Sequence, residues 1–398
     1  MERVFDHLTQ EQVDALEVQT EIQRADSFLA ASNIRDSSRL QLIIEVLQRF
    51  VRVLTEADQT AVDELVEPYL GQSSGQYLYR LEAEAIPAEL TQLGRVYQQL
   101  LERFEADYGD TEIYRILQRV YTEHFTDVAD QVQVRPADTL GSASLQSPDD
   151  PDATYRKKGA QESRGQVIHV AETCHPDHQL RLITDVAVAP NTTDDSTILA
   201  ARVERMQAKT PALAERHTDA GYVSDTTDQA LQAADITLIQ TAIKGRTAAV
   251  PLEILSPETG PYRVRCPEQT VTAHRTRKRW KAEFEWAICT ECPVQEACQT
   301  RVGKAARRRY FDGADAQRHA RWRRWAALPE ERQTLRPNVE ATVREMQGAV
   351  VNGTLKVHGT FATATYALLR AMGMNFGRIS RFLADPETAI TLEALLPR

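Results

Sequence analysis

The chain has 398 residues, 42% hydrophobic and 26% charged, which is the composition of a folded globular protein with two or three structural units. No apolar run approaches the roughly 20 residues that span a bilayer. The N-terminus has no basic-then-apolar signal region, so we expect a cytoplasmic protein with no membrane partner.

The formal net charge of −10 is unevenly distributed along the chain. Residues 1–150 contain 28 Asp and Glu against 12 Arg, a balance of −16. Residues 263–325 contain 16 Lys and Arg against 7 acidic residues, a balance of +9. A basic segment in an acidic protein is typical of a face that meets phosphates, and a solvated charged helix is the alternative interpretation.

The first predicted element is a strand over residues 18–26. Residues 38–135 are then predicted to form an all-helical insertion, because apolar residues recur at helical spacing and Asp36 and Ser37 are candidate caps. The apolar stripes run through Leu40, Ile43, Ile44, Leu47, Phe50, Val51 and Leu54, then Leu90, Leu93, Val96, Tyr97, Leu100, Leu101 and Phe104, then Ile113, Ile116, Leu117, Val120, Tyr121 and Phe125.

Residues 136–151 predict a loop by their Pro, Ser and Asp content. The apolar pattern beyond this loop is typical of strands, and residues 167–171 and 180–188 predict a strand pair. Asp194 and Asp195 are candidate caps of the helix that follows, which carries Ile198, Leu199, Val203 and Met206.

A short segment then reaches Asp219, followed by a predicted helix through residues 230–234 and a strand over residues 236–243. This order predicts a mixed α/β sheet that places the strand bearing Asp26 beside the strand that ends at Asp219.

Three carboxylates lie in recognisable short sequence motifs: Asp26 in residues 24–27, Asp219 in residues 218–222 and Glu340 in residues 336–340. We expect the two Asp at strand ends and the Glu on a late helix. Such an acidic pocket can hold two divalent cations about 4 Å apart, one to activate an attacking oxygen and one to stabilise the leaving oxygen.

The helix that carries Glu340 is predicted from an apolar stripe and from Pro337, which suits a first helical turn. Glu340 and Arg344 lie on the face beside that stripe, with Gln347. A metal ligand with a phosphate-contacting neighbour and a solvated Glu–Arg pair four residues apart are both open interpretations. The stripe consists of Val339, Val343, Met346 and Val350.

Four of the five cysteines lie close together in the sequence: Cys266, Cys289, Cys292 and Cys298. A Cys-x2-Cys pair with two further Cys suits tetrahedral zinc, and unligated thiols or an iron–sulfur cluster are alternatives. Disulfides are the poorer explanation in a reducing cytoplasm. Cys174 stands apart and is expected to be a buried small residue.

A basic and aromatic stretch follows the cysteines, over residues 307–310 and 319–325. Arg side chains can bind phosphates bidentately, and Trp322 and Trp325 can stack on bases. The same two Trp, three residues apart on a helix, can equally anchor that helix to a core.

Together these phrases resemble the DDE transposases of bacterial and archaeal insertion sequences, in the group usually called "eleven eighty-two", related to the larger "four" and "five" families. The resemblance runs in the family's order from about residue 17 to near residue 383. The matching stretches are residues 24–35 with 38–40, 145–148, 152–158, 172–174, 182–186 and 218–222, the cysteine segment and residues 336–343.

The resemblance implies an RNase H-like core in which Asp26, Asp219 and Glu340 bind Mg²⁺ or Mn²⁺. It implies double-stranded transposon-end and target DNA as substrates, and a homodimer that pairs two ends. In that chemistry water attacks the end phosphodiester, and the freed 3′-OH then attacks target DNA. The DNA contacts expected are Arg336, Arg344, Lys157, Lys158, Arg307, Arg308 and Arg309, of which Arg336 and Arg344 can instead help to hold the helix.

The sequence departs from the family pattern in three ways. The Tyr and Lys of the related families' Tyr-x2-Arg-x3-Glu-x6-Lys signature are Gln333 and Gln347 here, so Arg344 or Lys356 would have to replace the Lys. The usual Gly-Tyr before the second strand is Gly-Gln at residues 165–166. Only 25 residues precede Asp26, whereas family members carry a helical N-terminal domain there, so the resemblance implies a truncated transposase or an inactive DNA-binding derivative.

The expected organisation has five parts. They are the first catalytic strand region at 1–37, the helical insertion at 38–135, the RNase H-like core at 136–255, the four-cysteine and basic-aromatic module at 256–330, and the catalytic Glu helix with C-terminal helices at 331–398.

Overall fold

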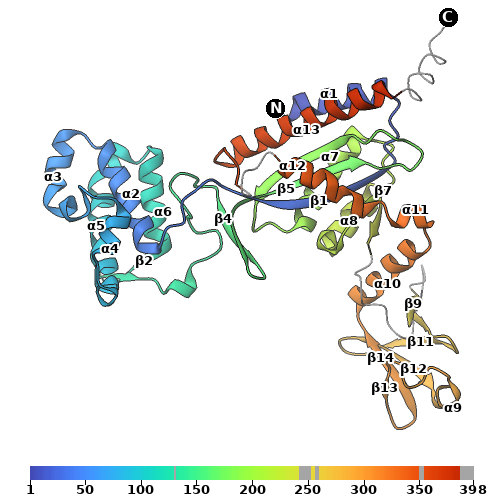
Figure 1. Cartoon of the computed structure of the whole chain (residues 1–398). Coiled ribbons are helices and arrows are strands. Elements are labelled where there is room, and N and C mark those ends of the chain that lie inside the picture. The colour runs from blue at the N-terminus through green and yellow to red at the C-terminus, as the bar shows by residue number, and fades with distance from the viewer. Residues whose placement is uncertain (130, 242–251, 256–259, 349–353, 386–398) are drawn as a thin grey trace, which may run out of the picture.

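The computed structural model describes residues 1–129, 131–241, 252–255, 260–348 and 354–385. A central α/β core joins a helical lobe on one side and a small sheet below it (Figure 1). In the described residues no helix is long and apolar enough to cross a membrane.

The central sheet contains six strands within the described residues, in the order β4-β5-β1-β7-β8, with β6 also paired to β5. β1 is parallel to β7, and β7 to β8, whereas β5 is antiparallel to β1, β4 and β6. The predicted mixed sheet is therefore confirmed. The strands are β1 (Ile22–Ala31), β4 (Thr154–Lys158), β5 (Gln161–Thr173), β6 (Ile183–Pro190), β7 (Glu215–Thr218) and β8 (Thr237–Gln240).

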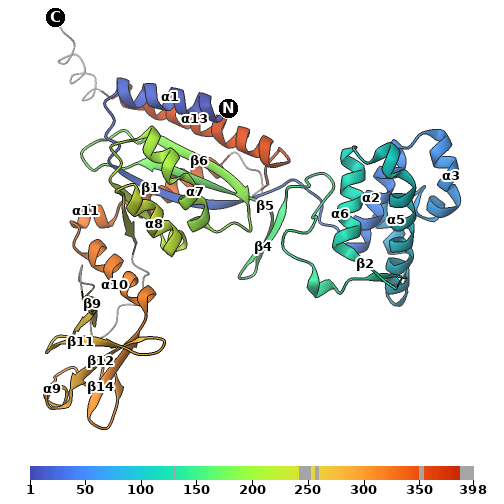
Figure 2. The ribbon, with the colours of Figure 1, turned by 180° about the vertical axis from the view of Figure 1, so that it is seen from behind.

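Helices cover both faces of this sheet. α1 (Glu2–Ala15) and α13 (Thr360–Ala384) lie side by side over one face, as both ribbon views show (Figure 2). α12 (Val339–Gln347) packs on the same face. α7 (Asp195–Lys209) and α8 (Asp225–Ala233) cover the other face. Side chains of a strand alternate between faces, so Phe28 and Ala30 of β1 pack towards α13 and Ala25 packs towards α7.

The helical lobe has its own apolar core, built from the stripes that the sequence predicts. Ser38, rather than Asp36 or Ser37, caps the first helix, in a capping box with Gln41. The insertion is not all-helical, because it ends in the hairpin of β2 and β3. Its elements are α2 (Arg39–Val53), α3 (Glu56–Val66), α4 (Ser74–Tyr79), α5 (Ile86–Tyr108), α6 (Glu112–His124), β2 (Phe125–Val128) and β3 (Gln131–Val134).

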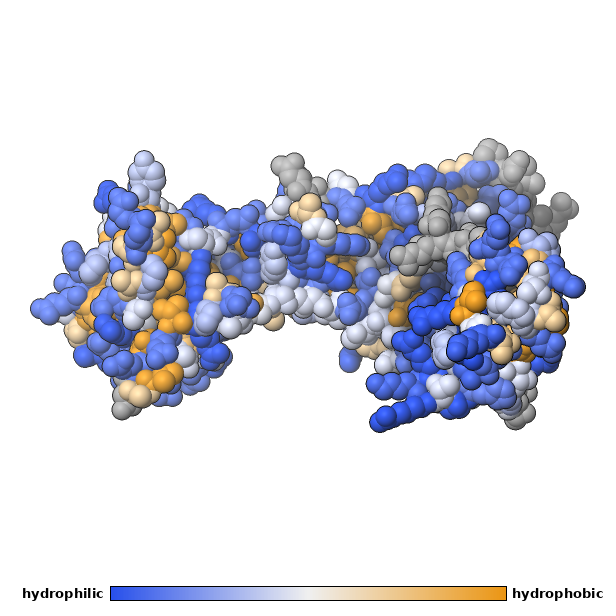
Figure 3. All heavy atoms as spheres, turned by 90° about the horizontal axis from the view of Figure 1, so that it is seen from below, coloured by the Kyte–Doolittle hydropathy of each residue, from blue (hydrophilic) through white to orange (hydrophobic). Residues whose placement is uncertain are grey.

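The four clustered cysteines lie beside a second sheet, after β10, on and just after α9 and in the loop before β13, and we call this part the cysteine module (residues 252–255 and 260–311). Six strands form this sheet within the described residues, in the order β13-β14-β12-β11-β10-β9. Hydrophilic side chains cover much of this end of the molecule, whereas apolar side chains reach the surface of the helical lobe (Figure 3). Its elements, with the two helices that follow, are β9 (Glu253–Leu255), β10 (Arg263–Arg265), β11 (Thr270–Arg275), β12 (Trp280–Glu285), α9 (Trp286–Glu291), β13 (Arg301–Val302), β14 (Ala306–Phe311), α10 (Gly313–Ala326) and α11 (Glu330–Gln333).

Several sequence predictions need correction at element boundaries. β1 begins at Ile22 and continues to Ala31, so Asp26 lies inside a strand and not at its end, because residues 23–31 pair with β5. The strand predicted over residues 236–243 is β8, and its last two residues, like Val350, lie outside the described residues. The strand predicted over residues 167–171 lies within β5, and the one predicted over residues 180–188 is β6, which begins at Ile183 and ends at Pro190.

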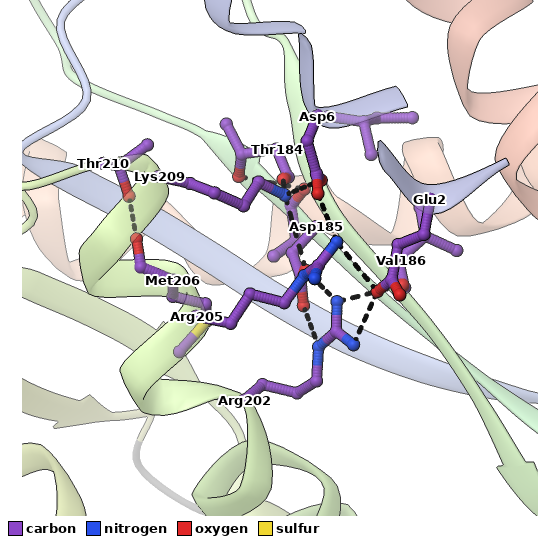
Figure 4. Close-up of polar contacts among 12 residues, drawn as sticks. Glu2, Asp6, Thr184, Asp185, Val186, Arg202, Arg205, Met206, Lys209 and Thr210 are labelled. Atoms are coloured by element: carbon purple, nitrogen blue, oxygen red, sulfur yellow. Dashed lines mark hydrogen bonds and ion pairs between the residues drawn. The ribbon is translucent and has the colours of Figure 1, made fainter. Parts of the chain in front are cut away.

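An ion-pair network fixes α7 against α1 and the sheet (Figure 4). The buried Asp185 of β6 binds Arg202 at 2.5 Å and lies 3.7 Å from the Lys209 ammonium. Arg202 also binds Glu2 at 2.8 Å, and Lys209 binds Asp6 at 2.8 Å. Burial alone would raise the pKa of Asp185, but the two cations outweigh it and lower the pKa to about 2.

Candidate active site

The parallel pairing of β1 and β7 brings Asp26 and Asp219 to one place. Arg24 pairs with His217, so the register carried two residues further sets Asp26 beside Asp219. Asp219 follows directly after β7, where its Oδ1 accepts a hydrogen bond of 2.8 Å from the Gly221 amide. Asp26 Oδ1 accepts one of 2.9 Å from the Ser27 amide. The backbone therefore fixes one oxygen of each carboxylate.

Glu340 approaches from α12, which packs across β1. Val339 and Met346 are buried and Val343 is partly buried, as the predicted apolar stripe requires. Glu340 lies on the exposed side of this stripe, with 53% of its side chain exposed. Arg344 is 80% exposed and 3.9 Å from Glu340.

All three predicted acids contact one guanidinium, that of Arg336. Its Nη2 lies 2.9 Å from Asp26 Oδ2 and 3.4 Å from Asp219 Oδ2, and its Nη1 lies 3.5 Å from Glu340 Oε1. Three carboxylates separated by more than a hundred residues each thus converge on one cation. Sequence reasoning treated Arg336 as a contact to DNA or a support for the helix, and nothing in the spacing indicated this central position.

The acid cluster has the donor type that hard divalent cations prefer, since carboxylate oxygens suit Mg²⁺ and Mn²⁺. In the described residues, however, no group of three or more His, Cys, Asp or Glu is arranged to hold a metal ion. The Arg336 guanidinium occupies the point on which the acids converge. Burial raises the pKa of Asp26. The Arg336 guanidinium and the Ser27 amide oppose that rise in the pKa, and the carboxylates of Asp219 and Asp195 add to it.

Asp195 is a fourth carboxylate at this site that the sequence analysis assigned only to helix capping. Its Oδ1 accepts a hydrogen bond of 2.5 Å from the Ser27 hydroxyl. No local pattern could have found it, because Ser27 lies 168 positions away.

A buried polar network ties α12 to the sheet. Glu172 of β5 is fully buried. Its Oε1 accepts a hydrogen bond of 2.7 Å from Arg24 Nε and forms an ion pair with Arg24 Nη2 at 2.6 Å. Its Oε2 accepts from the Thr342 hydroxyl at 2.6 Å and from Arg378 at 2.8 Å. Arg24 also donates to the Leu335 carbonyl at 2.7 Å. Glu172 therefore links β1, α12 and α13, and the Leu335 contact adds the residue just before Arg336.

The four cysteines of the module line one small pocket, together with Arg307 and Gln269. Burial raises the pKa of the Cys289 thiol, Arg307 opposes that shift, and the other three thiols add to it. All five cysteines are free, and Cys174 is buried as expected. The thiols are thus neighbours, without the arrangement of a metal site in the part of the chain that the structure describes.

The predicted DNA-contacting cations differ in exposure. Lys157 and Lys158 are exposed on β4, where Lys157 pairs with Glu162 at 3.0 Å. Arg307 is buried and donates to the Gln295 carbonyl, so it faces into the module rather than towards a ligand. Arg308 pairs with Glu283 at 2.9 Å, and both Arg308 and Arg309 are partly exposed. Trp322 is 40% exposed, which argues against its role as a core anchor.

The fold and the site together define a carboxylate cluster at one end of a mixed α/β sheet. Residues 262–380 match a family model described as a transposase DDE domain, and this match supports a DDE transposase. The matched region contains Glu340, Arg336 and the four module cysteines, but neither Asp26 nor Asp219. DDE transposase domains generally use divalent metals and act on DNA. No curated protein and no solved structure matches the chain.

Proposed function

We propose that this chain is an insertion-sequence transposase of the "eleven eighty-two" group, in which Asp26, Asp219 and Glu340 form a two-metal site. The observation that carries the proposal is the convergence of these three acids, from β1, the end of β7 and α12, on one point. The strand order supports an RNase H-like core, since along the path β6-β5-β1-β7-β8 only β5 is antiparallel to β1.

The proposed reaction begins with attack of water on the phosphodiester at a transposon end, which frees a 3′-OH. That 3′-OH then attacks a phosphodiester of target DNA, joins to its phosphorus and displaces the target's own 3′-OH. Divalent ions, when bound, would supply activation of the attacking oxygen and stabilisation of the leaving oxygen. Asp26 and Asp219, each fixed by a backbone amide, would hold the ions together with Glu340 of α12. Arg336 leaves the carboxylates and pairs with a DNA phosphate, which its bidentate guanidinium suits.

The proposal extends to two features outside the acid cluster. The four module cysteines hold a structural zinc ion, supported by the pocket that they line together. A homodimer pairs two transposon ends, with Lys157, Lys158, Arg308, Arg309 and Arg344 available to phosphates.

A second candidate function is a DNA-binding derivative without catalytic activity. The position of Arg336 favours it, because an arginine that neutralises all three acids competes with metal ions for them.

Cleavage of a labelled duplex that contains the flanking element ends, in Mg²⁺ or Mn²⁺, tests both candidates. Wild type is compared with Asp219→Ala and with Asp225→Ala, an exposed acid six positions later. The transposase requires metal-dependent cuts at the ends that vanish only in Asp219→Ala. Salt-sensitive DNA binding without cleavage would favour the inactive derivative. Absence of salt-dependent DNA binding would overturn both.

A further inference from the structure

The hairpin of β11 and β12 carries a group of cations that no acid neutralises. Residues 274–281 contain five Lys and Arg and no Asp or Glu. Within the described parts of the chain, only Lys281 among the five lies within 4.0 Å of a carboxylate, that of Glu283. The four unpaired cations are all exposed: Arg275, Arg277, Lys278 and Arg279. This hairpin is therefore a concentrated and accessible positive charge.

Cations elsewhere that the sequence analysis assigned to DNA already have acid partners. Lys157 pairs with Glu162 at 3.0 Å. Arg308 pairs with Glu283 at 2.9 Å. Such a cation gains less from a phosphate, because it first loses the attraction of its own carboxylate. The hairpin cations lose no such partner, so a polyanion gains the full interaction with them.

The tip of the hairpin is a tight turn that Thr276 closes. Its amide and its hydroxyl both donate to the Arg279 carbonyl, at 2.8 and 2.6 Å, and the Arg279 amide donates to that hydroxyl at 3.2 Å. Arg277 and Lys278 therefore form the tip itself. The commonest two-residue hairpin turns contain glycine, because they need positive φ angles, and neither tip residue has one. Turn geometry does not explain an Arg-Lys tip, and departures of this kind are typical of functional sites.

The base of the hairpin is fixed to the apolar core of the cysteine module. The Trp280 ring packs edge-on against Tyr262, with 4.9 Å between the ring centroids, and Tyr262 packs against Phe311 at 5.6 Å. Arg275 lies opposite Trp280 in the strand pair, and its guanidinium is 5.3 Å from the centre of that ring. The tip cations are thus held on an ordered two-stranded ribbon.

The shape and charge of this ribbon fit the major groove of duplex DNA. The major groove, about 12 Å wide, admits a two-stranded β-ribbon, and the phosphates that border it pair with Arg and Lys. The tip carries no apolar side chain, which disfavours a lipid surface. In both ribbon views the helical lobe lies on the other side of the central core, so it does not cover the hairpin (Figures 1 and 2).

We propose that the β11–β12 hairpin is a DNA-binding arm that enters the major groove, where Arg277, Lys278 and Arg279 pair with backbone phosphates. This inference rests on the proposed function in taking DNA as the ligand, and it does not require the acid site to bind metal ions. The three cations are not among the DNA contacts expected from the sequence.

Binding of the full chain to a labelled duplex that contains the flanking element ends, in EDTA and over a series of salt concentrations, tests the inference without catalysis. The triple variant Arg277→Gln, Lys278→Gln and Arg279→Gln should reduce the slope of log K against log salt by about 2.7, because each lost phosphate contact removes about 0.9. Its affinity should fall at least about tenfold at physiological salt. The matched control replaces with Gln three exposed arginines of the helical lobe that form no ion pair within 4.0 Å in the described residues, and it should bind as wild type does; they are Arg80, Arg95 and Arg103.

Methylation of guanine N7 by dimethyl sulfate reports on the groove, because N7 lies in the major groove. Wild type should protect N7 atoms within its site, and the triple variant should not protect them at the same occupancy. Double-stranded RNA of the same sequence should bind more weakly, since its deep and narrow major groove excludes the ribbon. Unchanged protection in the triple variant, or tighter binding to RNA, would overturn the inference.

The remaining outcomes separate the inference from the proposed function. Equal losses in the triple variant and in the lobe control would overturn the inference, because net charge alone would then explain binding. A hairpin-dependent slope in a chain that does not cleave would uphold the inference and overturn only the catalytic proposal. Absence of salt-dependent DNA binding in wild type would overturn both. If tryptophan fluorescence shows that the triple variant is misfolded, Arg277→Gln alone decides: its slope should fall by about 0.9, and an unchanged slope would refute the inference.

Discussion

The two groups of candidate metal ligands differ in how their members are brought together. Asp26, Asp219 and Glu340 come from three distant elements, and the central sheet and the buried Glu172 network assemble them. The four cysteines lie within residues 266–298, on α9 and in the loops beside one small sheet. The acid site therefore depends on the packing of the whole core, whereas the cysteine pocket is lined by residues of the cysteine module alone.

All four tryptophans lie between residues 280 and 325, so fluorescence reports on the cysteine module and α10, while circular dichroism reports mainly on the remainder.

The largest expected effect separates the module from the core. Cys292→Ser should eliminate a stoichiometric zinc ion and shift the tryptophan-detected unfolding transition to much lower denaturant, because structural zinc sites contribute folding energy directly. Mn²⁺ binding at the acids should not change. Metal analysis and urea unfolding measure these effects, and Cys174→Ala, at the buried cysteine outside the module, should retain zinc. A wild-type chain without zinc would show that the thiols are unligated.

The converse change should damage only the core. Glu172→Ala leaves Arg24 and Arg378 buried without their carboxylate and should lower the unfolding free energy by about 3–5 kcal/mol. Thr342→Val removes two hydrogen bonds, the one that the hydroxyl donates to Glu172 and the one that it accepts from Arg378 at 2.7 Å, and should cost about 2 kcal/mol. Urea unfolding followed by circular dichroism measures both losses. If the fluorescence transition moved by the same amount, the two regions would not be independent.

A third effect concerns acid stability of the core. Burial lowers the pKa of His169 to about 3, below its unfolded value of about 6.5. The neutral imidazole therefore contributes stability above pH 6.5, and this contribution is lost as the pH falls towards 3. Between pH 7 and pH 5 wild type should lose about 2 kcal/mol more than His169→Gln, in which the amide can still bond Tyr222. Parallel pH profiles of the two proteins would contradict this expectation.

The smallest effect tests the competition between Arg336 and metal ions. Arg336→Gln should bind Mn²⁺ about tenfold more tightly, or roughly 1.4 kcal/mol, because the ions no longer displace a guanidinium from three carboxylates. Arg332→Gln, four positions earlier and paired with Glu215 instead, is the control. Calorimetry measures both. Weaker binding in Arg336→Gln would indicate that the arginine orders the acids for metal rather than competing with it.

The sequence predicted the elements that depend on interactions between neighbouring residues, and it did not predict the contacts between distant ones. The α2, α5 and α6 helices were predictable because their apolar stripes repeat locally, and the β5–β6 pair because of its apolar strand pattern. The module strands were not predicted, since short strands such as Arg263–Arg265 carry charged residues on both sides of a single apolar one. Asp26, Asp219 and Glu340 were identified from the short sequence motifs around them. Their meeting on Arg336, and the arrival of Asp195, depend on side chains placed by contacts across more than a hundred residues.

The position of the helical lobe has a consequence for synthesis. β1 leaves the ribosome before the lobe, but its partners β5 and β7 lie beyond the lobe, at residues 161–173 and 215–218. The apolar core of the lobe is formed by residues that are close together in the sequence. We therefore expect the lobe to fold co-translationally while β1 is still unpaired. A folded lobe also draws the ends of a long connection together and lowers the entropic cost of β1–β5 pairing. The nascent chain thus has an interval in which β1 presents open edges, and its capture by a chaperone is expected in that interval.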